Sequence, residues 1–154
     1  MNMQKFTQKS LEAIQESQNI AIENQNAQVE QEHLLLALLQ QDNSLIKELL
    51  KKIGTSENFE NELENIISKM PKVVGGARPS NGIYVSQDLD ITLTNAEIIA
   101  KKMKDEYVSV EHIMLSMFDN GNRKIKDLFR TFNVNKNEFL KALTSVRGNT
   151  RVTT

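Results

Sequence analysis

The chain has 154 residues, no cysteine, a formal net charge of −1, and 39% apolar and 25% charged residues, which is typical of a globular protein with one core. No apolar run approaches the ~20 residues of a membrane-spanning helix. The composition excludes a disulfide framework and thiol chemistry, and the weak charge argues against a nucleic-acid partner, which needs a strongly basic stripe. Residues 1–10 contain no apolar signal segment, so we expect a cytoplasmic protein with no membrane or nucleic-acid partner.

Residues 5–70 have the apolar spacing of four successive helices. The first helix carries a rather polar stripe and should pack loosely or with small residues, at Ser10, Ile14, Ser17, Ala21 and Asn24. The second contains residues 34–39, which are apolar on all sides and therefore belong in the middle of a bundle. The third and fourth have apolar positions at Leu45, Ile46, Leu49, Leu50 and Ile53, and at Phe59, Leu63, Ile66, Ile67 and Met70. Gly54 suits the left-handed conformation that ends a helix.

Residues 71–82 contain both prolines and three of the six glycines of the chain. This composition cannot continue a helix, so we expect a linker over residues 71–84. Its glycines are not followed by the Gly-Lys-Ser/Thr of a phosphate-binding loop. The segment therefore predicts a connection between two parts of the domain and no nucleotide site.

Residues 85–148 repeat the same order of helices. Ser86 can cap a helix whose apolar stripe is Leu89, Leu93, Ala96, Ala100 and Met103. Residues 113–118 are again apolar on all sides. Two further helices have apolar positions at Ile125, Leu128, Phe129 and Phe132, ending at Asn133, and at Phe139, Leu143 and Val146. The final residues, RGNTRVTT, have no periodicity and indicate a tether, which we expect to leave the domain at residues 149–154.

The two halves are copies of one unit, offset by 79 positions. VEQEHLLLALL at 29–39 corresponds to VSVEHIMLSMF at 108–118, and nine of the thirty pairs between 29–58 and 108–137 are identical. This period exceeds the roughly 20 to 50 residues of solenoid repeats, so two packed copies are favoured over an open array. We predict an all-α fold, in which two pseudo-symmetric four-helix repeats, 6–70 and 85–148, pack as one eight-helix domain. We expect the domain, residues 1–148, to be monomeric.

Both histidines of the chain, His33 and His112, lie at corresponding positions of the two copies. A zinc protease would need His-Glu-x-x-His on one helix, and neither histidine has further metal ligands or a nucleophile beside it in the sequence. A histidine near the start of a helix, beside an apolar run, is more often a hydrogen-bonded structural residue. We therefore expect the histidines to hold the central helices, and expect no metal site and no catalytic site.

Glu32 and Glu111 precede the histidines and fall in the first turn of the central helices, where the helix dipole favours a carboxylate by roughly 0.3–1 kcal/mol. They could instead form an exposed acidic pair that accepts hydrogen bonds from a ligand, and both roles can hold. Ile91 and Ile98 lie almost opposite the apolar stripe of their helix. For them we favour contact with the other repeat over an exposed patch for a partner.

Two tandem four-helix units, each with a Glu-His start to its central helix, resemble the Clp amino-terminal domain of ATP-driven protein-remodelling machines. The resemblance covers essentially the whole chain. Four segments are most similar to the ClpB disaggregase branch of that family: KFTQKSLEAIQESQNIAIE at 5–23, ISKMPKV at 67–73, YVSQDL at 84–89 and VRGNTRVTT at 146–154. In that branch the last segment leads to the first ATPase module, which would follow residue 154.

The resemblance implies a substrate-interaction domain that binds exposed apolar segments of unfolded or aggregated polypeptides and delivers them to the protein's own hexameric ATPase ring. The domain itself would need no cofactor, whereas the full-length protein would use ATP and magnesium and contain a coiled coil. The positions that match substrate-binding residues of the family are Thr7, Asp105 and Glu111, with Leu93 at a neighbouring apolar groove. His112 stands where the best-known relatives have leucine, so the groove lining departs from theirs at this position.

The ClpC branch of the family implies a different function. Its amino-terminal domain binds adaptor proteins and phosphoarginine, and the glutamates of its Glu-His pairs contact the guanidinium group. Glu32 and Glu111 match those glutamates, and carboxylates suit the planar donor array of a guanidinium. A domain that binds an adaptor protein or phosphoarginine is therefore the alternative to one that binds apolar segments.

Overall fold

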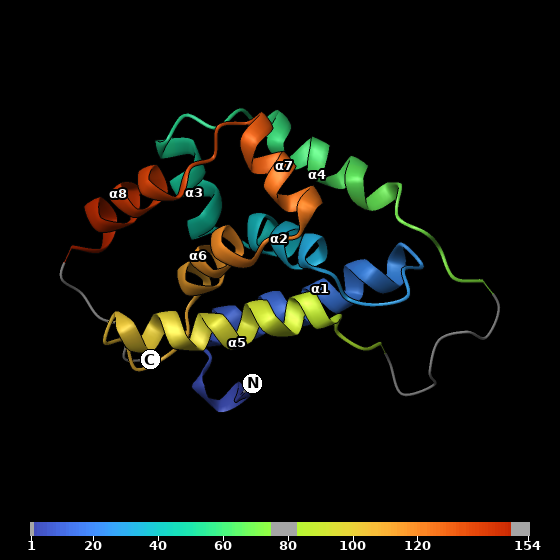
Figure 1. The fold of residues 1–154 in the computed structure, drawn as a ribbon, viewed down its shortest axis with the longest axis horizontal. Helices are drawn as coiled ribbons and strands as arrows, with labels where there is room; N and C mark the ends of the chain where they lie inside the picture. Colours follow the sequence, from blue (N-terminus) through green and yellow to red (C-terminus); the bar gives the residue numbers. More distant parts are fainter. Residues whose placement is uncertain (1, 75–82, 149–154) are drawn as a thin grey trace.

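The computed structural model describes residues 2–74 and 83–148, so part of the expected linker and the expected tether at 149–154 lie outside the described residues. Within them the chain forms a short 3₁₀ helix, Met3–Lys5, and eight α-helices (Figure 1). The first repeat contains α1 (Gln8–Glu23), α2 (Gln31–Gln40), α3 (Leu45–Lys52) and α4 (Asn58–Ser68). The second contains α5 (Gln87–Lys102), α6 (Val110–Asn120), α7 (Arg123–Thr131) and α8 (Lys136–Arg147). The predicted all-α fold with eight helices is confirmed.

Polar caps and left-handed residues set the ends of these helices. The Ser86 hydroxyl accepts an N–H from the first turn of α5, as expected, and Thr7 does the same for α1 at the corresponding place in the first repeat. Gly54 and Asn133, which follow α3 and α7, have φ angles of 83° and 55°. Both predicted helix ends are therefore confirmed, and they are related by the offset between the copies.

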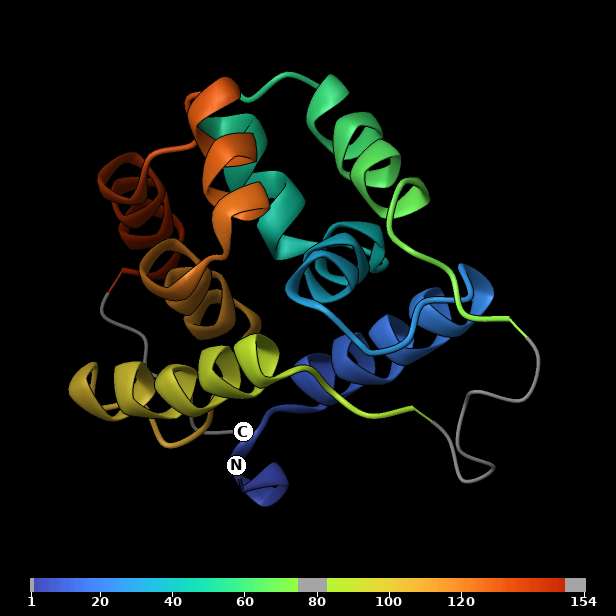
Figure 2. The same ribbon diagram turned by 45° about the vertical axis from the view of Figure 1, so that its right-hand side comes forward.

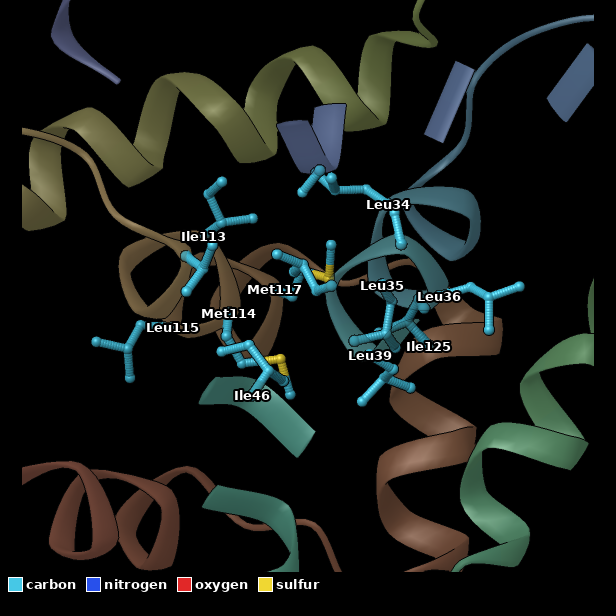
Figure 3. Packing of buried hydrophobic residues seen from close by; sticks show 14 of the residues in the cluster. Leu34, Leu35, Leu36, Leu39, Ile46, Ile113, Met114, Leu115, Met117 and Ile125 are labelled. Carbon is cyan, nitrogen blue, oxygen red and sulfur yellow. The ribbon is translucent and has the colours of Figure 1, made fainter. Parts of the chain in front are cut away.

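The helices form three layers (Figure 2). One layer contains α1 and α5, the middle layer contains α2 and α6, and the third contains the remaining four helices. Residues 34–39 of α2 and 113–117 of α6 are buried, and side chains of both helices lie in the core between them (Figure 3). Full burial of one such aliphatic side chain contributes about 1.5–3 kcal/mol. The central position predicted for these two segments is confirmed.

The third helix of each repeat packs against the other repeat. α3 contacts α6 and α8, and α7 contacts α4. Ile46 of α3 has no exposed surface and lies next to Met114 of α6 (Figure 3). The rings of Phe59 in α4 and Phe129 in α7 stack with centroids 6.2 Å apart. The two repeats therefore share one core and are not two separate four-helix bundles.

Two short backbone pairings join the repeats reciprocally. Phe6, before α1, pairs with Val108, before α6; Val85, before α5, pairs with Val29, before α2. Thr7, which follows Phe6, donates its backbone N–H to the Val108 carbonyl oxygen over 2.9 Å. Ser86, which follows Val85, donates to the Val29 carbonyl oxygen over the same distance. The pairs are related by the offset of 79 positions, so the duplication extends to the contacts between the copies.

Three expectations about packing have different outcomes. The polar stripe of α1 is tightly packed, since Ser10 and Ser17 have no exposed surface and their small side chains let α1 approach α2 closely. The expected contact of Ile91 and Ile98 with the other repeat is wrong. They are 43% and 47% exposed, because α5 contacts α6 and α2 with its opposite face. Val146, expected on the apolar side of α8, is also exposed.

Candidate functional site

The two histidines connect the starts of the central helices to the loops before them. The Nδ1 atom of His33 accepts the N–H of the N-cap residue over 2.8 Å, and its Nε2 lies 2.7 Å from Asn26 Oδ1. His112 repeats this arrangement over 2.9 Å, with its Nε2 atom 2.7 Å from Asp105 Oδ2. Because each Nδ1 accepts a backbone N–H, the neutral ring carries its proton on Nε2 and donates it to the loop. The structural role predicted for both histidines is confirmed.

Both imidazole rings are fully buried, and burial disfavours their charged form. Burial lowers the pKa of His33 from 6.5 to about 4. Burial also lowers the pKa of His112, although the hydrogen bond with Asp105 opposes this effect. Both rings are therefore neutral near pH 7 and act as fixed hydrogen-bonding groups.

The loop residue that accepts the hydrogen bond from the histidine Nε2 atom differs between the repeats. It is an amide, Asn26, in the first repeat and a carboxylate, Asp105, in the second. Oδ1 of Asp105 forms an ion pair with Nη2 of Arg147, the last residue of α8. The other terminal guanidinium nitrogen, Nη1, lies 3.9 Å from Glu111 Oε2. The side chains of Asp105, Glu111 and Arg147 are 0%, 8% and 12% exposed, so solvent screens these charges only weakly. We call these three residues the Arg147 network.

Arg147 is a residue that reasoning from the sequence did not identify. It lies in the segment without helical periodicity that suggested a tether, whereas in the structure it completes α8 and faces the carboxylates. The available sequence signal is a basic residue in the last turn of a helix, where the dipole favours a cation. That signal is too common to indicate a site.

A groove of about 520 Å³ borders the Arg147 network. Its walls come from the starts of α1 and α6 and from the loop between α2 and α3, and they include Thr7, Asn43, Leu45, Val110 and Glu111. The pairing of Phe6 with Val108 brings Thr7 and Glu111 together, although they belong to different repeats. We call this the Thr7 groove. The Thr7 hydroxyl in it also accepts the Ser10 N–H at the start of α1.

A second groove, of about 270 Å³, lies beyond the pairing of Phe6 with Val108. Its walls include Lys5, Glu97, Ile98, Asp105 and Val108, and we call it the Ile98 groove. Asp105 thus belongs to one groove and Glu111 to the other, with the Arg147 guanidinium between the two carboxylates. The structure places Thr7, Asp105 and Glu111 in one region, and their part in binding stays a prediction.

Leu93 and Glu32, the other expected site residues, lie outside this region. Leu93 has no exposed surface, so the structure places it in the core and not on a groove wall. Glu32 is 3% exposed, its Oε1 atom accepts a hydrogen from Asn122 Nδ2 over 3.1 Å, and burial raises its pKa. The expected position of Glu32 and Glu111 in the first helical turn is confirmed. The alternative prediction, that the two glutamates form an exposed acidic pair, is wrong, because both carboxylates are buried against internal partners.

In the other half of the molecule, at the region that corresponds to the Thr7 groove, Gln31 forms hydrogen bonds from the first repeat to the second. The side-chain oxygen of Gln31, Oε1, accepts the backbone N–H of Asn122 over 2.7 Å. Its amide donates to Thr92 Oγ1 and to the Asn120 carbonyl oxygen, both over 2.9 Å. The second repeat has Val110 at this position, and valine cannot form such bonds. The duplication has therefore produced two unlike regions, and only one of them is bordered by the Arg147 network.

Two negative findings apply to residues 2–74 and 83–148. No group of three or more histidine, aspartate or glutamate side chains in this part of the chain could hold a metal ion. No helix within it has both the length and the apolar character needed to cross a membrane.

Comparison with known proteins identifies the family. Residues 5–132 match the family described as the Clp repeat (R) N-terminal domain. The chaperone protein ClpB of Clostridium tetani is 38% identical over 155 residues, a match that covers 100% of this chain and 18% of that protein. The chain thus spans less than two thirds of the length of such curated relatives.

Solved structures agree with the sequence comparison. The Hsp104 N-terminal domain from Candida albicans has a TM-score of 0.83 and 25% identity, covering 96% of this chain and 95% of that one. A ClpV N-domain in complex with a VipB peptide has the same fold, with a TM-score of 0.73, 19% identity, and coverage of 95% and 89%. The family match covers most of the chain, and the match to the ClpB relative covers the whole of this chain. The chain belongs to the Clp repeat N-terminal domain family, as the duplicated Glu-His helix starts predicted.

Proposed function

We propose that this domain binds exposed apolar segments of unfolded or aggregated polypeptides and delivers them to the hexameric ATPase ring of a longer, ClpB-like disaggregase. The observation that carries the proposal is the pair of exposed isoleucines on α5, one of which, Ile98, lines a groove beside Asp105. Exposed apolar side chains beside a groove favour contact with an apolar partner. ATP and magnesium would act in the ring and not in this domain.

Two features support binding that is weak and reversible. Both grooves are open depressions at the surface, so a bound segment would bury few contacts. A flexible segment also loses conformational entropy when it is ordered, which lowers the affinity. We expect dissociation constants in the micromolar to millimolar range, roughly −4 to −8 kcal/mol. Weak binding suits a domain that must release its substrate to the ring.

The fold is also compatible with peptide binding. A ClpV N-domain of the same fold has been solved with a VipB peptide. We extend peptide binding to this chain as part of the proposal, without assuming that the peptide would occupy the same surface.

Titration of the isotope-labelled domain with an uncharged apolar peptide tests the proposal. Amide shifts should move around Thr7, Asp105, Glu111 and Ile98. Ile98→Ser should weaken binding, whereas Ile22→Ser, at a similarly exposed isoleucine of α1, serves as the matched control. Amides that stay in place around both grooves at saturating peptide would refute the proposal.

Recognition of phosphoarginine or of an adaptor protein is the second candidate. One observation favours it, because the position of the Glu111 carboxylate suits a guanidinium, although a ligand would have to displace that of Arg147 from it. Glu32 also carries a carboxylate in the first turn of its helix, although Asn122 engages it. Calorimetry with free phosphoarginine, on the parent and on the variant with Glu32→Ala and Glu111→Ala, separates the two functions. Absence of binding heat in the parent would remove this candidate.

A further inference from the structure

The carboxylates beside the proposed binding region already hold a cation of the protein itself. Glu111 forms part of the wall of the Thr7 groove and also faces Nη1 of Arg147. Both oxygens of Asp105 are engaged, one by His112 and the other by Arg147. A cationic side chain that entered the Thr7 groove would therefore meet a carboxylate that Arg147 has already partly neutralised.

Arg147 has an advantage over an arginine that arrives with a substrate. Its backbone is part of α8, and its side chain is only 12% exposed, so its position is fixed before any ligand binds. A substrate arginine would have to lose the entropy of its own flexible side chain and backbone, and it would also have to displace Arg147. Displacement would leave the Arg147 guanidinium without its carboxylates in a poorly solvated place, which is costly.

Within residues 2–74 and 83–148, the first repeat lacks this arrangement. Glu32, which corresponds to Glu111, accepts a hydrogen bond from the neutral amide of Asn122. Asn26, which corresponds to Asp105, carries no charge. Among the residues that the structure describes, the internal cation thus belongs to the copy whose carboxylate borders the Thr7 groove, and the other copy does not repeat it.

We propose that Arg147 is a specificity-determining residue of the binding region: by holding Asp105 and Glu111, it makes the Thr7 groove accept uncharged apolar segments and discriminate against arginine-bearing ones. This inference deepens the proposed function and rests on it. It also predicts that removal of the Arg147 side chain turns the same carboxylates into a site for a guanidinium.

The test compares two short peptides on the parent domain, on Arg147→Ala and on Arg147→Lys. One peptide is apolar and uncharged, and the other is the same peptide with arginines in place of some of its residues. Arg130→Ala is the matched control, because Arg130 lies on the surface with its side chain 76% exposed. Affinities come from the amide shift of Glu111, so that cations held by other acidic surface residues are not counted. Circular dichroism checks that each variant is folded.

The parent and Arg130→Ala should bind the arginine peptide no more tightly than the apolar one. Arg147→Ala should bind the arginine peptide about tenfold more tightly than the parent does, the effect of one charge-assisted hydrogen bond. Arg147→Lys, which keeps the positive charge, should resemble the parent.

Absence of that gain in a folded Arg147→Ala variant would overturn the inference. So would a parent domain that already prefers the arginine peptide at Glu111 by about tenfold. That comparison needs no variant and decides the matter even if Arg147→Ala does not fold. Failure of the apolar peptide to bind any of the proteins would refute the proposed function instead, and the arginine comparison would still report on Arg147 alone.

Discussion

The buried imidazole of His33 predicts a specific loss of stability in acid. Burial lowers its pKa from 6.5, the value expected in the unfolded chain, to about 4 in the fold. Because the unfolded state takes up the proton first, the contribution of His33 to stability is complete above pH 6.5 and is lost as the pH falls from 6.5 to about 4. Over that interval the loss amounts to about 3 kcal/mol of unfolding free energy.

The variant His33→Gln isolates this contribution. Glutamine at the third helical position can accept the N-cap N–H as the imidazole does, but it does not titrate. At neutral pH the variant should be less stable by about 1–3 kcal/mol, because it loses packing and the bond to Asn26. Urea unfolding of both proteins between about pH 7.5 and pH 4 should show this gap closing or reversing by about 3 kcal/mol.

The difference in unfolding free energy between the parent and His33→Gln does not depend on the other titrating groups. The surface carboxylates and His112 are present in both proteins, so their protonation changes both unfolding free energies equally. Stability curves that stay parallel between about pH 6.5 and pH 4 would refute the reasoning, since the depressed pKa of His33 would then have no energetic consequence.

Arg147→Ala should lower the unfolding free energy by about 3–5 kcal/mol, because it leaves the buried Asp105 carboxylate without its ion pair to arginine. Arg130→Ala should change it by less than about 0.5 kcal/mol, and urea unfolding at neutral pH compares the two. Gly121→Ala should cost about 1–3 kcal/mol in the same assay, because a Cβ atom would lie 2.6 Å from the Met117 carbonyl oxygen. Ile98→Ser should leave stability within about 1 kcal/mol and should weaken binding of the apolar peptide in the shift titration.

Much of the fold could be predicted because the sequence contains its main unit twice. A weak pattern in one copy, such as the polar stripe of α1, could be interpreted with the help of the clearer stripe of α5. The packing of α3 and α7 against the other repeat could not be predicted. Periodicity identifies the apolar face of a helix but not the surface that this face contacts. Ile46 would satisfy the same pattern against the central helix of either copy.

The candidate site was only partly predictable, for a related reason. The resemblance to the Clp family placed Thr7, Asp105 and Glu111, and the structure brings these three into one region. Arg147 had no such signal, because an ion pair between residues 105 and 147 has no characteristic spacing in the sequence. The exposure of Ile98 depends on which face α5 turns to its neighbours, and the sequence does not state this.

The reciprocal pairing of the repeats explains why the proposed binding region needs both of them. Thr7 reaches Glu111 only because the segment before α1 of the first repeat pairs with the segment before α6 of the second. A single repeat would present either residue without the other, so the duplicated unit is the smallest one that can form the Thr7 groove. The symmetry also supplies a second region of the same origin, in which Gln31 joins the neighbouring backbone by hydrogen bonds. Differences at a few corresponding positions, an amide for a carboxylate and a glutamine for a valine, therefore distinguish the proposed binding region from its counterpart in the other half of the molecule.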